Sequence, residues 1–124
     1  NDGNEKAYCC FYSNARDFAR IGKLFLNKGK WNGKQIVSEE YINQCITPAP
    51  VLDDGKSNTI YGYQWWLVPY HPGVFYARGI LGQYIIVIPQ KQIVIVRLGE
   101  KRGPILKETV PQEVNDLVEW GMGL

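Results

Sequence analysis

The chain has 124 residues, of which 45% are hydrophobic and 21% charged, and these values are ordinary for one globular domain or a piece of one. Its 14 basic and 12 acidic side chains leave a net charge of +2, which argues against nucleic acid or an anionic membrane as a partner. The longest apolar run, residues 84–88, is too short to span a bilayer. The chain opens on Asn1 rather than methionine, which suggests a processed product or a piece of a longer polypeptide.

The first predicted elements are a helix and a small hairpin. Ser13 and Asn14 are typical of a helix N-cap and Asp17 would follow in the first turn, so a helix is predicted over residues 14–27. An Asn-Gly turn within residues 30–37 then predicts a hairpin. The inward stripe of the helix would consist of apolar or small residues at helical spacing: Phe18, Ile21, Gly22, Leu24 and Phe25.

A second helix is predicted to begin after Ser38 and to stop at residues 47–50, which contain two prolines. Residues 14–47 would therefore form a helical segment, and the polar residues 49–59 predict a surface loop. Three side chains of the second helix are expected to face inward: Tyr41, Ile42 and Cys45.

Residues 60–98 carry the pattern on which the fold depends. Aromatic and β-branched residues dominate, and Gly and Pro interrupt them, which predicts antiparallel strands over residues 60–68, 74–88 and 93–98. The apolar runs are nearly continuous, so helices are expected to cover both faces of the last strands.

A last helix would begin near Thr109 or Val110, with Pro111 in its first turn and Gly121 and Gly123 at its end. Its apolar stripe would be Val110, Val114, Leu117 and Val118. The order of elements predicts one α+β domain over residues 1–124, in which residues 60–124 form antiparallel strands plus a C-terminal helix.

Few side chains are placed for chemistry. None of the serines, at positions 13, 38 and 57, has a lysine three residues later, and the single histidine, His71, lies in a predicted turn with no nucleophile nearby. Asp53 and Asp54 fit a solvated loop better than a catalytic carboxylate pair. Trp65 and Trp66 would point to opposite faces of a strand, one into the core and the other toward a pocket or a partner.

The three cysteines are expected to be reduced and partly buried, because an odd number cannot pair completely. They are Cys9, Cys10 and Cys45. With one histidine and no C-x-x-C pair, the sequence indicates neither a metal site nor a cofactor.

Several stretches together indicate a family. Residues 12–29 read Y-S-N-A-R-D-F-A-R-I-G-K-L-F-L-N-K-G, and residues 31–41 read W-N-G-K-Q-I-V-S-E-E-Y. Residues 61–66 read Y-G-Y-Q-W-W, and residues 76–89 read Y-A-R-G-I-L-G-Q-Y-I-I-V-I-P. In this order and spacing they resemble the C-terminal portion of the serine β-lactamase-like hydrolases, which include penicillin-binding proteins, class C β-lactamases, esterases and 6-aminohexanoate-dimer hydrolases.

The resemblance implies a Ser/Lys/Tyr acyl-transfer enzyme, in which the serine of an S-x-x-K motif attacks an amide or ester carbonyl. It also implies that the strand over residues 76–88 borders the substrate cleft. The family carries the third of its motifs on that strand, and Arg78 would occupy the position of the cation in this motif. The backbone N–H of Ile80 would donate a hydrogen bond to the oxyanion.

The same resemblance implies that Gly79, Trp66 and Tyr76 bind substrate. Two other interpretations rest on the residues alone. Arg78 could be a surface charge at a strand end, and Gly79 and Gly82 could be bulge glycines.

The chain departs from the family in one respect, because it contains no S-x-x-K motif. The nucleophile, its lysine and its tyrosine would lie upstream of Asn1. Residues 12–14 match literally the Y-x-N motif that carries the family's catalytic tyrosine, but they immediately precede the predicted helix, so they are interpreted as its N-cap and not as that motif.

The chain is therefore interpreted as a C-terminal fragment of a hydrolase, inactive alone, whose parent cleaves a small-molecule amide or ester. The family is often exported, which favours a periplasmic or extracytoplasmic location. A sheet face and edge left uncovered would favour self-association. The alternative is a non-catalytic α+β binding module that holds a ligand through Trp65 or Trp66, Tyr63 and Tyr76.

Overall fold

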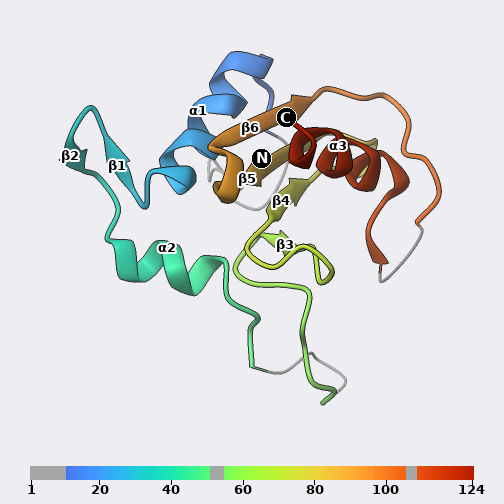
Figure 1. Ribbon diagram of the computed structural model, residues 1–124, viewed down its shortest axis with the longest axis horizontal. Coiled ribbons are helices and arrows are strands. Elements are labelled where there is room, and N and C mark those ends of the chain that lie inside the picture. Colours follow the sequence, from blue (N-terminus) through green and yellow to red (C-terminus); the bar gives the residue numbers. More distant parts are fainter. Residues whose placement is uncertain (1–10, 51–54, 106–108) are drawn as a thin grey trace, which may run out of the picture.

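The computed structural model describes residues 11–50, 55–105 and 109–124, and it consists of a small antiparallel sheet between helices (Figure 1). The sheet has four strands in the order β3-β4-β5-β6, and a separate two-stranded ribbon pairs β1 with β2. The α+β class predicted from the sequence is confirmed. In chain order the elements are α1 (Ala15–Leu26), β1 (Lys30–Trp31), β2 (Lys34–Gln35), α2 (Glu39–Cys45), β3 (Trp66–Leu67), β4 (Phe75–Arg78), β5 (Tyr84–Ile88), the 3-10 helix η1 (Pro89–Lys91), β6 (Ile93–Arg97) and α3 (Gln112–Met122).

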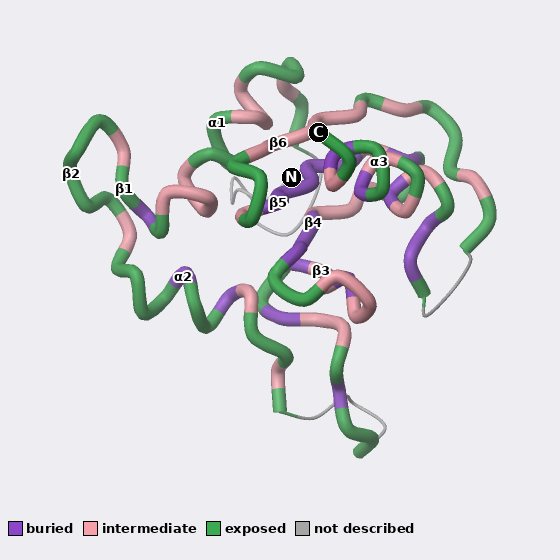
Figure 2. Tube along the Cα trace, viewed as in Figure 1, coloured by how far each residue is buried: buried purple, intermediate pink, exposed green. Residues whose placement is uncertain are grey.

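Strand β5 is buried on both faces, as its uninterrupted apolar run predicts. Its alternate side chains separate into two hydrophobic clusters. Tyr84, Ile86 and Ile88 pack with the buried valines of α3, whereas Ile85 and Val87 pack with aromatic residues of α1. The buried stretches of the trace lie along β4 and β5 and recur on α3 (Figure 2). Helices before and after the sheet therefore cover its two faces.

Helix α1 begins where the sequence predicts, and the structure shows which of the two predicted residues is the N-cap. The Asn14 side chain accepts a hydrogen bond from the Asp17 N–H at 3.0 Å, so Asn14 is the N-cap. Ser13 instead donates its hydroxyl proton to the Asp17 carboxylate at 3.1 Å. Helix α1 approaches the sheet most closely at Gly22, where an added Cβ would lie 2.6 Å from a methyl carbon of Val94.

The inward stripes of α1 and α2 are narrower than predicted. Ile21 is 39% exposed and Tyr41 is 51% exposed, so both expectations are wrong. Because α1 rests on the sheet at a glycine, its stripe is set by Phe18, Phe25 and Leu26 on either side of that contact. Helix α2 starts at its predicted cap, because Ser38 accepts from the Tyr41 N–H at 3.2 Å.

The hairpin predicted within residues 30–37 is present as β1 and β2. Asn32 and Gly33 form its turn and have φ values of 48° and 78°. Both central residues of a type I′ turn require positive φ, which explains the Asn-Gly pair.

The strand predicted over residues 60–68 is mostly a turn. Only Trp66–Leu67 pairs in the sheet, because Gln64 adopts a φ of 66° and the Gly62 N–H donates to the Trp65 carbonyl at 2.8 Å. An added Cβ on Gly62 would lie 2.0 Å from the Cys45 carbonyl oxygen. This close approach joins the end of α2 to the sheet and tolerates only glycine.

In the loop predicted over residues 49–59, the described residues 49–50 and 55–59 include one buried polar side chain, which the sequence did not reveal. Asn58 is 6% exposed, donates to the Ala49 carbonyl at 2.9 Å, and accepts from the N–H groups of Ile60 and Tyr61 at 3.1 Å each. Asp53 and Asp54 lie outside the described residues.

The last helix starts later than predicted. Helix α3 begins at Gln112 with Pro111 at its N-cap. Of the two glycines predicted to end it, Gly123 is the C-cap and Gly121 lies inside the helix. The predicted stripe is otherwise correct, since Val110, Val114 and Val118 are 1% exposed or less. Gly121 faces the sheet, where an added Cβ would lie 2.5 Å from the Ile88 side chain.

The first turn of α3 is joined to the segment after β6 by Glu113. Its carboxylate accepts from the Gly103 N–H at 2.6 Å and lies 3.9 Å from the Arg97 guanidinium. Burial by itself raises the pKa of Glu113, but the hydrogen bonds from Gly103 and from its own backbone N–H, with the charges of Arg97 and Arg102, hold this pKa below its ordinary value.

We expect Glu113→Gln to lower the free energy of unfolding by roughly 1–2 kcal/mol near pH 7, because a neutral amide accepts weaker hydrogen bonds than a carboxylate and does not attract Arg97. A lowered folded-state pKa contributes stability above the unfolded pKa, and that contribution disappears as the pH falls through the folded value. The difference between the wild type and the variant should therefore close in acid. Urea unfolding at pH 7 and below pH 4 measures it, with the exposed Glu100→Gln as control. A gap that is independent of pH would contradict the assignment.

Candidate functional site

The residues expected to form a site gather where β4 ends. Trp66 on β3 pairs in register with Tyr76 on β4, and Arg78 is the last residue of that strand. The chain then turns through residues 79–83 and re-enters the sheet at Tyr84, which pairs with Arg78. The continuous strand expected over residues 76–88 is therefore two strands, with Gly79 and Ile80 in the turn between them.

A cation stacked on aromatic rings marks the end of β4. The Arg78 guanidinium lies 4.8 Å from the centre of the Trp66 ring, and the Tyr61 ring lies 4.8 Å from that same ring. Arg78 and Trp66 are both half-buried. Such a stack orders a flexible arginine and keeps its charge available at the surface.

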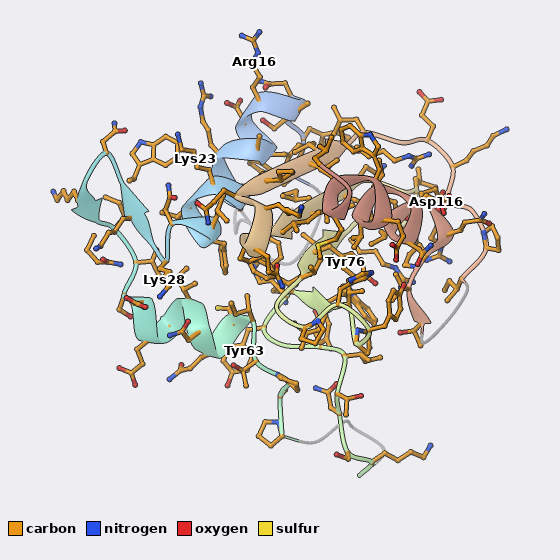
Figure 3. All side chains as sticks on the ribbon, in the orientation of Figure 1. Arg16, Lys23, Lys28, Tyr63, Tyr76 and Asp116 are labelled. Atoms are coloured by element: carbon orange, nitrogen blue, oxygen red, sulfur yellow. The ribbon has the colours of Figure 1, made fainter. Side chains whose placement is uncertain are left out.

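Beneath this stack lie two buried tyrosines with unpartnered hydroxyl groups. Tyr76 and Tyr84 are 0% and 2% exposed, and among the described residues neither hydroxyl has a hydrogen-bond partner. Burial raises the pKa of Tyr76 to about 12, and the charge of Arg78 acts in the opposite direction. Figure 3 places Tyr76 among the crowded side chains at the centre of the molecule, whereas Arg16 projects away from α1.

The burial of Tyr76 changes the part it can play. A side chain that is 0% exposed underlies the site and does not contact a ligand, so Tyr76 leaves the set of substrate-binding candidates. Trp65 is likewise 4% exposed, in the opposite core against Phe25 and Phe75. The two tryptophans do face opposite sides, as predicted. The alternative binding module keeps only Trp66 and the 49%-exposed Tyr63 as accessible aromatics.

The backbone N–H of Ile80 is an available donor. Within residues 79–82 the other N–H groups are used: Gly79 donates to the Gln83 carbonyl at 2.8 Å, Gly82 to the Gly79 carbonyl at 3.3 Å, and Leu81 to the Gln83 side chain at 3.1 Å. The Ile80 N–H donates to no group of the described chain. Its side chain is 81% exposed. The turn thus presents one unbonded donor, two residues after Arg78 in the sequence.

The other candidate residues do not join this site. Ser13 is occupied at the start of α1, and His71 is in a turn with its Nε2 2.7 Å from a carboxylate oxygen of Glu119. Cys45 is buried with a free thiol, and this burial raises its pKa. Cys9 and Cys10 lie outside the described residues.

The part of the chain that the structure describes contains neither a candidate metal site nor a candidate membrane-spanning helix. Within residues 11–50, 55–105 and 109–124, no three His, Cys, Asp or Glu side chains cluster closely enough to hold a metal ion. No helix in those ranges is long and apolar enough to cross a bilayer.

An open groove of about 580 Å³ does exist, but it lies beside α2 and is lined in part by Asn43, Gln44 and Tyr63.

Two residues of the site escaped the sequence analysis, Gln83 and Arg97. The Gln83 amide donates to the Gly99 carbonyl at 2.8 Å, and Arg97 donates to the carbonyls of Gly82 and Lys101. The Arg97 guanidinium also lies 5.9 Å from the Tyr84 ring. The G-x-x-G-Q letters of residues 79–83 were the only signal for Gln83, and no local signal marks Arg97.

Comparison with known proteins supplies the relatives of this chain. No family model matches it. A 6-aminohexanoate-dimer hydrolase from Paenarthrobacter ureafaciens is 29% identical over 97 residues, which cover 73% of this chain and 25% of that protein. A solved structure of a candidate 6-aminohexanoate-dimer hydrolase from Bacillus anthracis is also 29% identical and superposes with a TM-score of 0.59, covering 87% of this chain and 27% of that one.

The chain is related to the β-lactamase-like serine hydrolases. Both relatives bear the name of one hydrolase in this family, and the second shares the fold as well as the sequence. The chain spans about a quarter of the length of each. In this chain, the two stretches that carry most of the resemblance, residues 61–66 and 76–89, come together through the pairing of β3 with β4 and the stacking of Arg78 on Trp66.

Proposed function

We propose that this chain supplies one wall of the active site of a serine hydrolase that cleaves amide or ester bonds through an acyl-serine intermediate. In this reaction a serine Oγ bonds to the substrate carbonyl carbon and the carbonyl oxygen becomes an oxyanion. The amine or alcohol then leaves, and water later releases the acyl group. The nucleophile, its lysine and its tyrosine belong to a part of the polypeptide outside this sequence, so the chain alone is inactive.

The observation that carries the proposal is the free Ile80 N–H. An oxyanion hole needs a fixed N–H donor that is not consumed by the fold and that faces an accessible space. The neighbouring amides at Gly79, Leu81 and Gly82 are all bonded within the turn, whereas that of Ile80 is not. The turn is closed by strand pairing on both sides, so the donor is held in place.

Arg78 contributes charge beside that donor. Its guanidinium is half-buried over Trp66, and it precedes the turn by one residue. A cation held on an aromatic ring next to a backbone donor stabilises negative charge, either on the oxyanion or on an anionic end of the substrate. Gly79 stays a substrate-binding candidate through its backbone, because the Gln83 side chain fills the space where a Cβ would stand. The contact with Trp66 supports placing Arg78 in the site rather than on the general surface.

The outer edge of β6 is a candidate surface for self-association. The sheet ends at this strand, and along Ile93–Arg97 no described segment pairs with that edge. Self-association through it is part of the proposal, since an unpaired edge is a template for another strand. Sedimentation velocity at increasing protein concentration tests it, and a monomer throughout would contradict it.

The proposed activity is tested on the full product of the gene that encodes this chain and on the 124-residue chain alone. Both are incubated with a p-nitrophenyl ester and with a chromogenic β-lactam. The full product should turn over one of these substrates, and replacing the serine of its S-x-x-K motif by alanine should abolish that turnover. The chain alone should match the uncatalysed rate.

Ser13→Ala is the internal control. Because Ser13 is bonded to Asp17 at the helix start, its replacement should leave turnover by the full product intact. Turnover by the isolated chain that disappears in Ser13→Ala would overturn the assignment of the nucleophile. A gene with no S-x-x-K upstream would overturn the proposed function.

A further inference from the structure

Gln83 follows the turn that carries the proposed oxyanion donor, and its side chain is folded under that turn. The side-chain oxygen accepts from the Leu81 N–H at 3.1 Å. An added Cβ on Gly79 would lie 2.3 Å from the same oxygen, so the glycine makes room for the amide. Of the two central residues of the turn, Leu81 therefore directs its N–H inward to Gln83, and only the Ile80 N–H is left unbonded.

The other end of the same amide joins the turn to a distant part of the chain. The Gln83 Nε2 donates to the Gly99 carbonyl at 2.8 Å, sixteen residues along the sequence and just beyond β6. Arg97 makes a second connection by donating to the Gly82 carbonyl. Gly82 has a φ of 84°, and an added Cβ there would lie 2.5 Å from both the Arg97 guanidinium and the Lys101 carbonyl oxygen. Two side chains, those of Gln83 and Arg97, thus connect the turn to the end of β6 and the segment after it.

We propose that Gln83 is the positioning residue for the Ile80 N–H. The inference rests on the proposed function, because it identifies the residue that orients the proposed oxyanion donor. One amide group occupies the competing donor of Leu81 and fixes the turn to the segment after β6. A donor held in this way needs no reorganisation when the oxyanion forms. Gln83 touches neither substrate nor reacting atoms in this arrangement.

The test replaces Gln83 by methionine, which has similar length and lacks both hydrogen-bonding atoms, in the full gene product. The kcat for a p-nitrophenyl ester should fall by about 10-fold to 100-fold, because small misplacements of a catalytic group have effects of this size. The KM should change little, because the donor acts on the transition state. Gln92→Met is the matched control. Gln92 donates its side-chain N–H to the Pro89 carbonyl at 3.0 Å in the turn at the other end of β5, and this variant should keep the wild-type kcat.

A second variant separates positioning from general support of the fold. If Gln83 acts only through the Ile80 N–H, then Gln83→Met should have little further effect in a protein that already carries Ile80→Pro, in which that N–H is absent. Full additivity of the two losses would overturn the inference, as would a wild-type kcat for Gln83→Met.

A measurement on the 124-residue chain keeps this test apart from the proposed function. In amide hydrogen exchange by NMR, the Leu81 N–H should be protected in the wild type and exchange faster in Gln83→Met, while Gln92→Met leaves it protected. Unchanged protection of Leu81 would overturn the inference whatever the activity. A full product that turns over no substrate, in which Leu81 nevertheless loses protection, would instead refute the proposed function and leave the structural assignment of Gln83 standing.

Discussion

Ile80→Pro should lower kcat/KM of the full gene product by roughly 10²–10³-fold, the range found when one oxyanion donor is removed. The substitution is unusually selective at this position. Proline removes the N–H, which bonds to nothing in the described chain, and the side chain that it replaces is 81% exposed. Ile80 follows Gly79 in the turn closed by the Gly82 N–H, and proline is favoured at that second position of a β-turn.

The comparator is Ile80→Ala, which shortens the same side chain and keeps the N–H. It should lose far less activity than the proline variant, and both should unfold at the same temperature as the wild type. Steady-state kinetics with a p-nitrophenyl ester, together with thermal unfolding, measure these quantities. Equal losses in the two variants would show that the Ile80 side chain and not its amide matters, and would remove the donor from the mechanism.

Phe75→Ala should lower the free energy of unfolding by about 3–5 kcal/mol, as large-to-small changes of buried aromatic residues do. Phe75 is 1% exposed on β4, and its ring lies 5.1 Å from that of Trp65 and 6.3 Å from that of Phe25. Phe75 therefore connects strand β4, the turn that contains Trp65, and helix α1 in one hydrophobic cluster. The void would lie directly behind the strand that carries Arg78.

Phe11→Ala is the matched control, because Phe11 is 69% exposed and its ring lies 5.9 Å from that of Phe18. Its loss should be about 1 kcal/mol or less. Urea unfolding of both variants gives the comparison. If the two losses were equal, the cluster between α1 and the sheet would not be the core that the structure indicates.

The caps and turns were predictable because their causes are local. Asn14 and Ser38 accept from N–H groups three residues away, and Asn32 and Gly33 are residue types that tolerate positive φ. The two-sided cover of the sheet was predictable as well, since β5 offers no polar face. The ordered stretches that resemble the family are likewise a property of the sequence alone.

The interruption of the predicted strand was not predictable from its own residues. Residues 74–88 have the composition of one long strand, yet Gly79 to Gln83 form a turn. The groups that hold the turn, the Gly99 carbonyl and the Arg97 guanidinium, come from beyond the next strand. Because these bonds span about fifteen residues or more, no short window of sequence contains both partners.

Sequence alone therefore determined the class of fold, the starts of the first two helices and the resemblance to a family, since each depends on spacing between neighbours or on a run of residue types. Tertiary structure decided which members of the expected site are accessible. Tyr76 is removed from the surface because α3, more than thirty residues later, packs over it. Ile80 is left with an unbonded N–H because Gln83 accepts that of Leu81 instead. Burial and the choice of hydrogen-bond partner depend on segments that meet only in the folded chain.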